Sequence, residues 1–345
     1  MAEREKVIIL KKAERHVLHW KGLLLFLAIL IGSSACGKNE TESHSFMDSL
    51  GEPISLEGEE LKIGDPKVGD STETSEEKDT AGEQPTELSQ TMALPILNPD
   101  GETLETRIHV PEGYERTTAD EGSLTAFLRE FPMKPDGAKV HLYDGSEKNT
   151  QNDHVAVFDL PLENYDLQQC ADSVMRIYAE YYWATQQYDK IKFHFTNGFL
   201  AEYGKWRDGN RISVNGNNVS WIKQKSKDTS YECFVRYLRT VFCYAGTLSM
   251  ERESQPTTLS AIKPGDVFLY GASPGHVVMI VDVCENEMGQ KAFLLAQGYM
   301  PAQEFHLLKN NDHPEDPWYY ESEVTYPFQT PEYLFQEGSL RKLDY

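Results

Sequence analysis

The sequence has little positive charge, and this shortage limits the partners it can bind. Its 345 residues hold 33 Lys and Arg against 55 Asp and Glu, a net charge of −22. Nucleic-acid binding requires basic surfaces that neutralise phosphates, so we expect no nucleic-acid partner. Metal-binding signatures are also missing, since the ten histidines include no HExxH and the five cysteines have no zinc-like spacing. We therefore expect neither a metal ion nor another cofactor.

The apolar segment near the N-terminus, GLLLFLAILIG, is too short to span a bilayer comfortably. It has about eleven residues, whereas a transmembrane helix needs about 20. It follows a basic stretch and ends at SSAC, with small residues before Cys36, as export signals do. SSAC resembles the lipobox of bacterial lipoproteins, which implies an exported, lipid-anchored protein of the cell envelope, attached to the membrane through a lipidated Cys36. An ordinary signal peptide or an uncleaved anchor is the alternative.

The segment that follows has few of the aromatic and apolar residues that a folded core requires. Residues 37–104 contain 17 Asp and Glu, 4 Lys and few aromatic residues. Such a composition buries too little apolar surface to offset the entropy lost on ordering. The sequence therefore predicts a signal peptide over 1–36, an acidic disordered linker over 37–104 and a single domain over 105–345.

The domain has no regular alternation of strands and helices. Helical patterns come first and three strand-like runs follow near the C-terminus, which favours an α+β fold with helices packed on a mainly antiparallel sheet. The Gly- and Asn-rich stretch 207–220 is expected to be a surface loop. The predicted strands are 106–110, 139–145, 154–160, 190–195, 266–271, 276–283 and 291–297, and the predicted helices are 122–131, a helix from Asp166, and 230–246.

Cys170 lies at the start of a strongly amphipathic helical pattern. With Asp166 as the N-cap and Gln169 completing a capping box, it occupies the fourth helical position. The positive end of the helix dipole favours a thiolate there, as a nucleophile requires. Alternatively, Cys170 is a buried structural residue that pairs with Tyr165 in a hydrophobic staple.

His276 opens the second of the three C-terminal strands and follows Gly275. An antiparallel hairpin places it within one or two positions of Gln297, whose amide would orient the imidazole. A structural histidine is the alternative. If the register slips, Gln303 or His306 would take the orienting role.

A cysteine at a helix start followed by "PGD-strand" and "GH-strand" segments resembles the papain-like cysteine peptidases and amidases of the NlpC and CHAP type. The resemblance implies a papain-like arrangement with Cys170 as nucleophile, His276 as general base and Gln297 as orienting group. The amide of Gln168 or Gln169, with the Cys170 main-chain N–H, would bind the oxyanion. The alternative role of these two glutamines is helix capping and solvation.

The segments DLQQCADSVMR, YAGTLS, PGHVVMIVD and LLAQGYMPAQ also resemble a family of exported bacterial lipoproteins described only as a domain of unknown function. Two hypotheses follow from the sequence. In the first, the protein is a cysteine hydrolase that cuts amide bonds, for example in cell-wall peptide. In the second, it is a noncatalytic lipoprotein that binds peptide or glycan on the same frame.

Overall fold

A nine-stranded sheet organises the folded part of the chain in the computed structural model, which describes residues 95–345. The predicted signal peptide, Cys36 and most of the linker lie outside these residues. The strands of the large sheet are β1 (Tyr114–Arg116), β2 (His154–Val157), β7 (Ser254–Pro256), β8 (Val267–Tyr270), β9 (His276–Asn286), β10 (Lys291–Gln297), β11 (His306–Leu308), β12 (Tyr319–Tyr320) and β15 (Leu340–Leu343).

The strand order is β2-β11-β10-β9-β8-β15-β7, with β1 paired to β9 and β12 paired to β10. Every pairing in this sheet is antiparallel. The smaller hairpins are β3 (Lys192–His194) with β4 (Leu200–Glu202), β5 (Asn210–Asn215) with β6 (Asn218–Lys223), and β13 (Phe328–Gln329) with β14 (Leu334–Phe335). The expected mixed architecture with mainly antiparallel sheets is confirmed.

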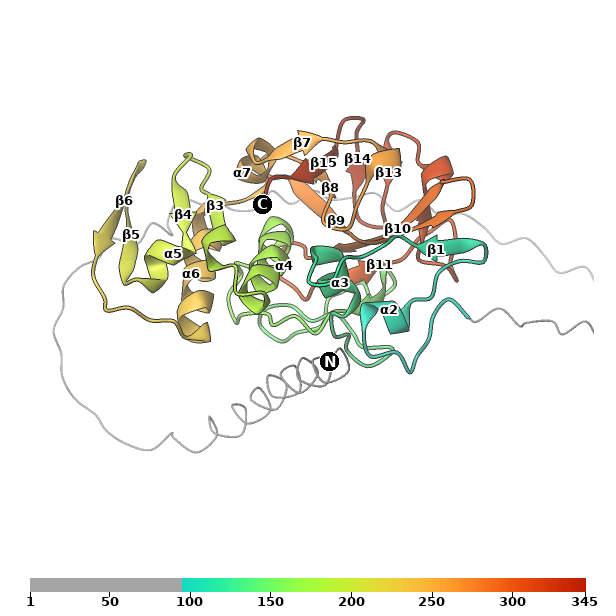
Figure 1. Cartoon of the computed structure of the whole chain (residues 1–345), viewed down its shortest axis with the longest axis horizontal. Coiled ribbons are helices and arrows are strands. Elements are labelled where there is room, and N and C mark those ends of the chain that lie inside the picture. Colours follow the sequence, from blue (N-terminus) through green and yellow to red (C-terminus); the bar gives the residue numbers. More distant parts are fainter. Residues whose placement is uncertain (1–94) are drawn as a thin grey trace, which may run out of the picture. The chain divides into compact units, whose positions relative to one another are not determined.

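Helices cover one face of the sheet. The pair α3 (Leu124–Arg129) and α4 (Cys170–Ala184) packs on β9 near the middle of the molecule (Figure 1). The other α-helices are α2 (Leu104–Arg107), α5 (Tyr203–Arg207), α6 (Tyr231–Tyr244) and α7 (Thr247–Arg252), and 3-10 turns cover Tyr188–Lys190, Leu259–Ala261 and Glu321–Glu323. Among residues 95–345, no helix has the length and apolar character needed to cross a membrane.

Two hydrophobic cores lie on opposite faces of the sheet, and β9 contributes to both. Val277, Met279 and Val281 enter the core that contains α4. Val278 and Ile280 enter the other core, with Phe328 and Phe335 of β13 and β14. Alternate residues of a strand point to opposite faces, so a strand buried on both sides is apolar throughout. This double burial explains the nearly unbroken apolar run of β9.

Local predictions failed in three segments. The strand expected over 139–145 is wrong, because His141 and Leu142 form only isolated bridges and the chain then enters a turn. The strand expected over 106–110 is wrong, because Thr103 and Thr106 form a capping box that starts α2. The loop expected over 207–220 is also wrong, because these residues include most of the β5–β6 hairpin. Its turn begins with Gly216 at φ +56°, a left-handed conformation that suits glycine in a two-residue hairpin turn.

The N-terminal boundary of the folded body also differs from the expected one. The sequence predicts that residues 95–104 belong to the linker, yet Leu97 forms a β-bridge with Ile108 and Leu104 is fully buried. The apolar side chains of this short segment therefore belong to the core that contains α4.

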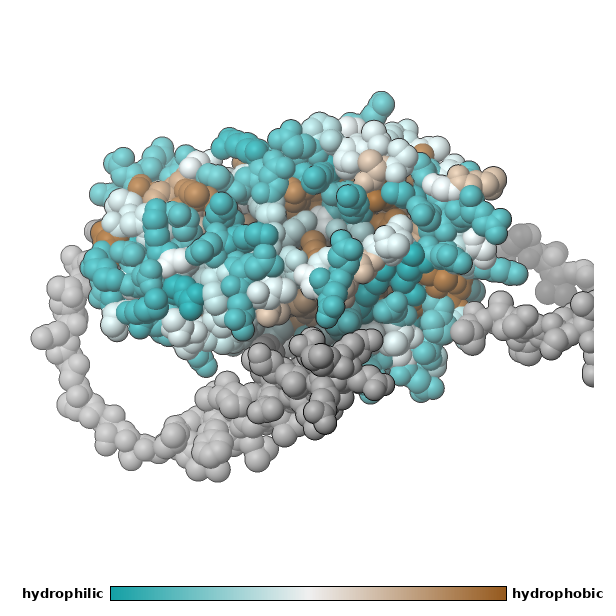
Figure 2. Space-filling view, in the orientation of Figure 1, coloured by the Kyte–Doolittle hydropathy of each residue, from teal (hydrophilic) through white to brown (hydrophobic). Residues whose placement is uncertain are grey.

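On the face shown in Figure 2, hydrophilic residues predominate and hydrophobic residues form small separate areas.

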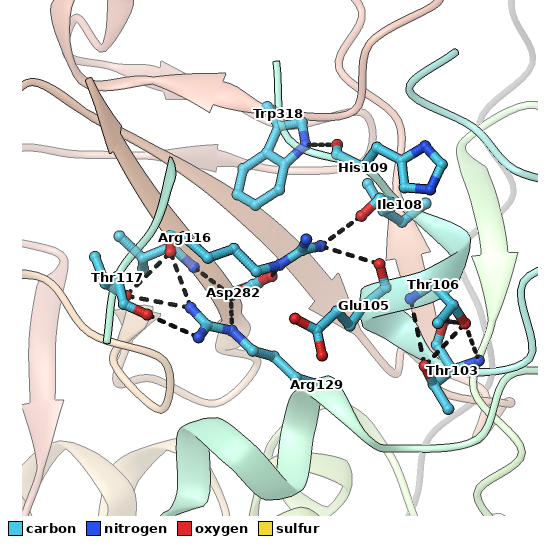
Figure 3. Close-up of polar contacts among 11 residues, drawn as sticks. Thr103, Glu105, Thr106, Ile108, His109, Arg116, Thr117, Arg129, Asp282 and Trp318 are labelled. Carbon is cyan, nitrogen blue, oxygen red and sulfur yellow. Dashed lines mark hydrogen bonds and ion pairs between the residues drawn. The ribbon is translucent and has the colours of Figure 1, made fainter. Parts of the chain in front are cut away.

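A buried carboxylate ties the N-terminal segments to the sheet. Asp282 of β9 is fully buried and accepts hydrogen bonds from Arg116 Nε at 2.7 Å and Arg129 Nε at 2.8 Å (Figure 3). Arg129 also donates to the Thr117 carbonyl at 2.7 Å. A buried carboxylate that receives two guanidinium groups is well paired, so removing it would leave buried positive charge.

Candidate functional site

Cys170 is the first residue of α4 and not the fourth helical residue expected from the sequence. The N-cap is Gln169, whose main-chain N–H donates to Asp172 Oδ2 at 3.1 Å in a capping box. Asp166 lies outside the helix and accepts from Gln169 Nε2 at 3.0 Å. The expected staple also fails, because Tyr165 is 52% exposed. The sequence favours Asp166 as the N-cap because Gln169 follows it at capping-box spacing, but in the fold the capping box is formed by Gln169 and Asp172.

The protonation state of Cys170 also differs from the expectation. Its side chain is 6% exposed, and burial, followed by the nearby Asp172 carboxyl group, raises the thiol pKa to about 11. The main-chain groups of Ala171 and Val277 act in the opposite direction but do not compensate. Loss of solvent penalises the charged form more than the helix dipole favours it. The resting group at neutral pH is therefore the thiol.

Alkylation should report this raised pKa directly. We expect the rate of Cys170 labelling by iodoacetamide to rise about tenfold per pH unit from pH 6 to pH 10, because only the thiolate reacts. At pH 7 the exposed Cys243 should be labelled faster than Cys170. Peptide mapping by mass spectrometry measures both rates in one sample, and denatured protein provides the reference. A Cys170 rate that levels off below pH 8 would contradict this expectation.

His276 and Gln297 are brought together as the sequence predicted. His276 begins β9 opposite Tyr270 of β8, and Gln297 ends β10. His276 Nε2 lies 2.8 Å from Gln297 Oε1, and both side chains are buried. Burial lowers the His276 pKa to about 4, and the Gln297 bond offsets only part of this effect. The imidazole is therefore neutral at pH 7 and able to accept a proton.

Cys170 lies beside the strand that carries His276. The main chain of Val277, the residue that follows His276, lies close enough to Cys170 to lower the thiol pKa in part. Burial raises the pKa of the Tyr333 hydroxyl, and the nearby Tyr270 and Cys170 raise it further. The Tyr333 ring is centred 4.7 Å from the His276 ring. Within residues 95–345 no hydrogen bond or ion pair joins Cys170 to His276.

Close packing of β10 on the start of α4 maintains this arrangement. Gly298 directly follows Gln297, and a Cβ atom there would lie 2.3 Å from Ser173 Oγ and 3.0 Å from the Gln169 carbonyl oxygen. A side chain at this position would require the Ser173 hydroxyl to move and would press on the Gln169 carbonyl oxygen. Asp166 adds a second connection, because its Oδ1 accepts from the Ala302 main-chain N–H at 2.7 Å.

A small cavity opens at His276. Its volume is about 200 Å³, room for one side chain or a small group. Aromatic rings dominate its walls, and the His276 ring is centred 4.7 Å from the Tyr299 ring. A substrate bound there would contact the imidazole and mainly apolar surface. The lining residues are Pro274, Gly275, His276, Tyr299, Met300 and Tyr333.

The two candidate oxyanion residues have different surroundings. Gln168 is 1% exposed, its Oε1 accepts from Arg176 Nη1 at 3.3 Å, and its Nε2 is buried without a hydrogen-bond partner in the described part of the chain. The Gln169 amide already donates to Asp166. Of the two side chains, Gln168 has the free donor.

The alternative orienting residues do not contact His276. His306 is paired with Gln297 across β10 and β11, and its Nδ1 is 2.8 Å from the Glu304 carbonyl oxygen. Gln303 is 1% exposed and forms a bridge with Leu142. The hydrogen-bonding role therefore belongs to Gln297.

The residues that hydrogen-bond to the other end of the Gln297 amide were not predicted from the sequence. Gln297 Nε2 donates to Glu332 Oε2 at 2.6 Å, and Lys148 Nζ donates to the same oxygen at 2.6 Å. No local pattern marks Lys148 or Glu332, because both lie in irregular segments far from the hairpin. Tyr299, which also contacts the His276 ring, lies only two residues after Gln297 and could have been noticed from this position in the sequence.

The next feature is the distribution of side chains that could bind a metal ion. Residues 95–345 contain no group of three or more His, Cys, Asp and Glu side chains placed to hold a metal ion. The four cysteines in this range, Cys170, Cys233, Cys243 and Cys284, are free thiols.

These residues define a mixed α/β protein with mainly antiparallel sheets, in which a buried cysteine begins a helix that packs on β9 and an oriented histidine begins β9 itself. Residues 104–342 match the domain of unknown function 4846 (DUF4846), and the chain belongs to this family. This match confirms the expected membership in a family described as a domain of unknown function. No curated protein and no solved structure matches the chain.

Proposed function

We propose that this protein is an exported, lipid-anchored cysteine hydrolase that cuts amide bonds, with cell-wall peptide as the substrate class. The helices and the sheet would form a papain-like frame in which Cys170 is the nucleophile, His276 the general base and Gln297 the orienting group. The carrying observation is that Gln297 orients the His276 imidazole beside a cavity, while the main chain of Val277, the next residue, lies close enough to Cys170 to act on the thiol pKa.

The chemistry would start from a neutral thiol and a neutral imidazole. As Cys170 Sγ attacks the carbonyl carbon, His276 Nδ1 takes the thiol proton and the carbon–sulfur bond forms. The imidazolium then returns the proton to the leaving nitrogen as the carbon–nitrogen bond breaks. Water hydrolyses the thioester, which releases the acid and restores the thiol. Gln168 Nε2 is the side-chain donor proposed for the oxyanion.

The resting geometry sets one requirement for this mechanism. No hydrogen bond joins the thiol and the imidazole before substrate binds, so binding must bring them into contact. Catalytic hydrogen bonds are often long in unliganded sites and tighten in the substrate complex. Substrate that fills the cavity would also exclude the remaining water, which strengthens the interaction between the groups.

Capture of the thioester tests the proposal. The purified protein is incubated with peptidoglycan fragments that carry peptide stems and is then quenched in acid. We expect a new primary amine in solution and an acyl group on Cys170, detected by mass spectrometry of the digested protein. If the fragments bind but stay intact, the protein is not a hydrolase of this class. If they neither bind nor react, the substrate class is also wrong.

One observation favours a second candidate, a noncatalytic lipoprotein that binds peptide or glycan through the same cavity. Cys170 is buried and has a raised pKa of about 11, as expected for a structural cysteine. In that case, replacement of Cys170 by serine should leave fragment affinity unchanged, whereas Tyr333→Ala should weaken it because Tyr333 lines the cavity.

Membrane attachment through Cys36 is the remaining part of the proposal, and it is supported by the SSAC sequence. Cys36→Ser is expected to abolish incorporation of a labelled fatty acid and to move the protein from the detergent phase to the aqueous phase in a partition experiment. Ser34→Ala provides the control, because it keeps a small residue before the cysteine. Unchanged labelling of the Cys36→Ser variant would exclude lipid attachment at this residue.

A further inference from the structure

Glu332 lies at the centre of a polar cluster behind the candidate site. Its Oε2 accepts from Gln297 Nε2 and from Lys148 Nζ, each at 2.6 Å, and lies 3.8 Å from His306 Nε2. Burial alone would raise the Glu332 pKa, but His306 and Lys148 outweigh burial and lower it to about 2. Glu332 is therefore a carboxylate at any pH at which the protein would work.

The charge of Glu332 decides which way the Gln297 amide points. A carboxylate only accepts hydrogen bonds, so the amide NH₂ must face Glu332 and the amide oxygen must face the other side. The opposite orientation would place the amide oxygen against the carboxylate and leave a buried donor without a partner. Gln297 is fully buried, so water cannot relieve that mismatch.

The orientation of the amide in turn decides where the His276 proton sits. The Gln297 oxygen lies 2.8 Å from His276 Nε2, and an amide oxygen needs a donor at that distance. A neutral imidazole carries only one N–H, so Nε2 must be protonated and Nδ1 keeps its lone pair. Nδ1 has no hydrogen-bond partner among residues 95–345.

The same short hairpin carries the carboxylate and one wall of the cavity. Glu332 and Tyr333 lie in the turn between β13 and β14, which is closed by a hydrogen bond from the Thr330 N–H to the Tyr333 carbonyl at 2.9 Å. The centre of the Tyr333 ring lies 4.7 Å from the centre of the His276 ring, and the centre of the Phe335 ring of β14 lies 6.0 Å from the centre of the same imidazole. The hairpin therefore holds the ring in place while Glu332 acts through Gln297.

We propose that Glu332 is a positioning residue that, through Gln297, holds His276 in the Nε2–H tautomer and leaves Nδ1 as the basic nitrogen. Lys148 keeps the carboxylate charged and fixed in place. The catalytic value of this tautomer rests on the proposed function, but the tautomer itself does not. The assignment extends the chain of contacts from His276 through Gln297 and Glu332 to Lys148, which are 21, 56 and 128 positions away from it in sequence.

Nitrogen NMR of histidine-labelled full-length protein tests the proposal. The chain has ten histidines, and the His276→Asn variant identifies the His276 signals by their loss. Long-range proton–nitrogen spectra distinguish a protonated ring nitrogen from one with a lone pair. In the wild-type protein at pH 7, we expect His276 to show only the Nε2–H pattern. A His276 with Nδ1–H, or an even mixture of tautomers, overturns the proposal without any variant of Glu332.

Glu332→Gln then tests the role of the charge. Its amide offers the Gln297 side chain either an acceptor or a donor, so we expect His276 to lose its exclusive Nε2–H pattern and become a mixture of tautomers. Glu253→Gln is the matched control, because Glu253 contacts His194 Nδ1 at 2.6 Å. It should change the His194 signals and leave His276 as in the wild type.

The outcomes separate this proposal from the proposed function. An unchanged Nε2–H pattern in folded Glu332→Gln overturns the positioning role, whatever the activity of the protein. If that variant does not fold, Lys148→Met serves instead, since an unfixed carboxylate should broaden or split the His276 signals. A protein that shows the expected tautomer and its loss in Glu332→Gln, yet releases no amine, keeps this inference and loses the hydrolase.

Discussion

Replacing Cys170 by alanine is expected to reduce amide hydrolysis by a factor of about a thousand or more, to the level of the buffer control. The proposed thioester cannot form without the sulfur, and no other thiol replaces it. Cys233 and Cys284 are buried in the core, and Cys243 is exposed on α6. The measurement is the rate of amine release from peptidoglycan fragments at saturating concentration.

The controls separate chemistry from folding and binding. Cys243→Ala should keep full activity, because this side chain is exposed near the end of α6 and has no part in the proposed reaction. Cys170→Ser should be as inactive as Cys170→Ala while binding fragments with unchanged affinity, since it keeps nearly the same shape. Activity above a tenth of the wild-type rate in Cys170→Ala would exclude this cysteine as the nucleophile.

Replacing Asp282 by alanine is expected to destabilise the folded protein by about 3–5 kcal/mol. The substitution leaves Arg116 and Arg129 without the carboxylate that pairs them, and the Asp282 side chain is fully buried (Figure 3). Loss of this carboxylate also removes contacts that join the segments before β2 to strand β9. The measurement is urea unfolding followed by tryptophan fluorescence.

The matched control is Asp208→Ala, which removes an exposed carboxylate that pairs with Lys227 at 3.0 Å. Exposed ion pairs contribute little, so its free energy of unfolding should stay close to that of the wild-type protein. In the double variant Asp282→Leu with Arg129→Met, part of the lost stability should return, because an apolar pair replaces a buried unpaired charge. Equal losses of unfolding free energy in Asp282→Ala and Asp208→Ala would contradict the interpretation that the buried Asp282 carboxylate stabilises the fold by pairing with the two arginines.

The candidate histidine could be found from sequence because strand periodicity is a local property. Residues 276–283 and 291–297 have apolar strand patterns, and the short polar turn between them restricts the register to a few positions. His276 and Gln297 are therefore brought close by the hairpin alone. The start of the cysteine helix was harder, since Asp166 has the chemistry of an N-cap but the helix of the folded chain begins after Gln169, with Asp172 as its capping-box partner.

Burial was the main quantity that the sequence did not reveal. The helix start predicts a stabilised thiolate at Cys170, but β9 and β10 pack over it and remove water, so the thiol pKa rises. Likewise, nothing near Asp282 in the chain predicts two arginine partners that are 166 and 153 residues away. Glu332 and Lys148 are 184 residues apart and meet only in the folded protein.

The sequence by itself determined the strands that carry His276 and Gln297, the helix that carries Cys170 and the acidic character of the chain, because periodicity, turns and composition are properties of neighbouring residues. Only the tertiary structure decided which charges are buried, which carboxylate orients Gln297 and how far the thiol is shielded from water. These depend on segments that are distant in sequence, and the cost of removing a charge from water is set by all of them together.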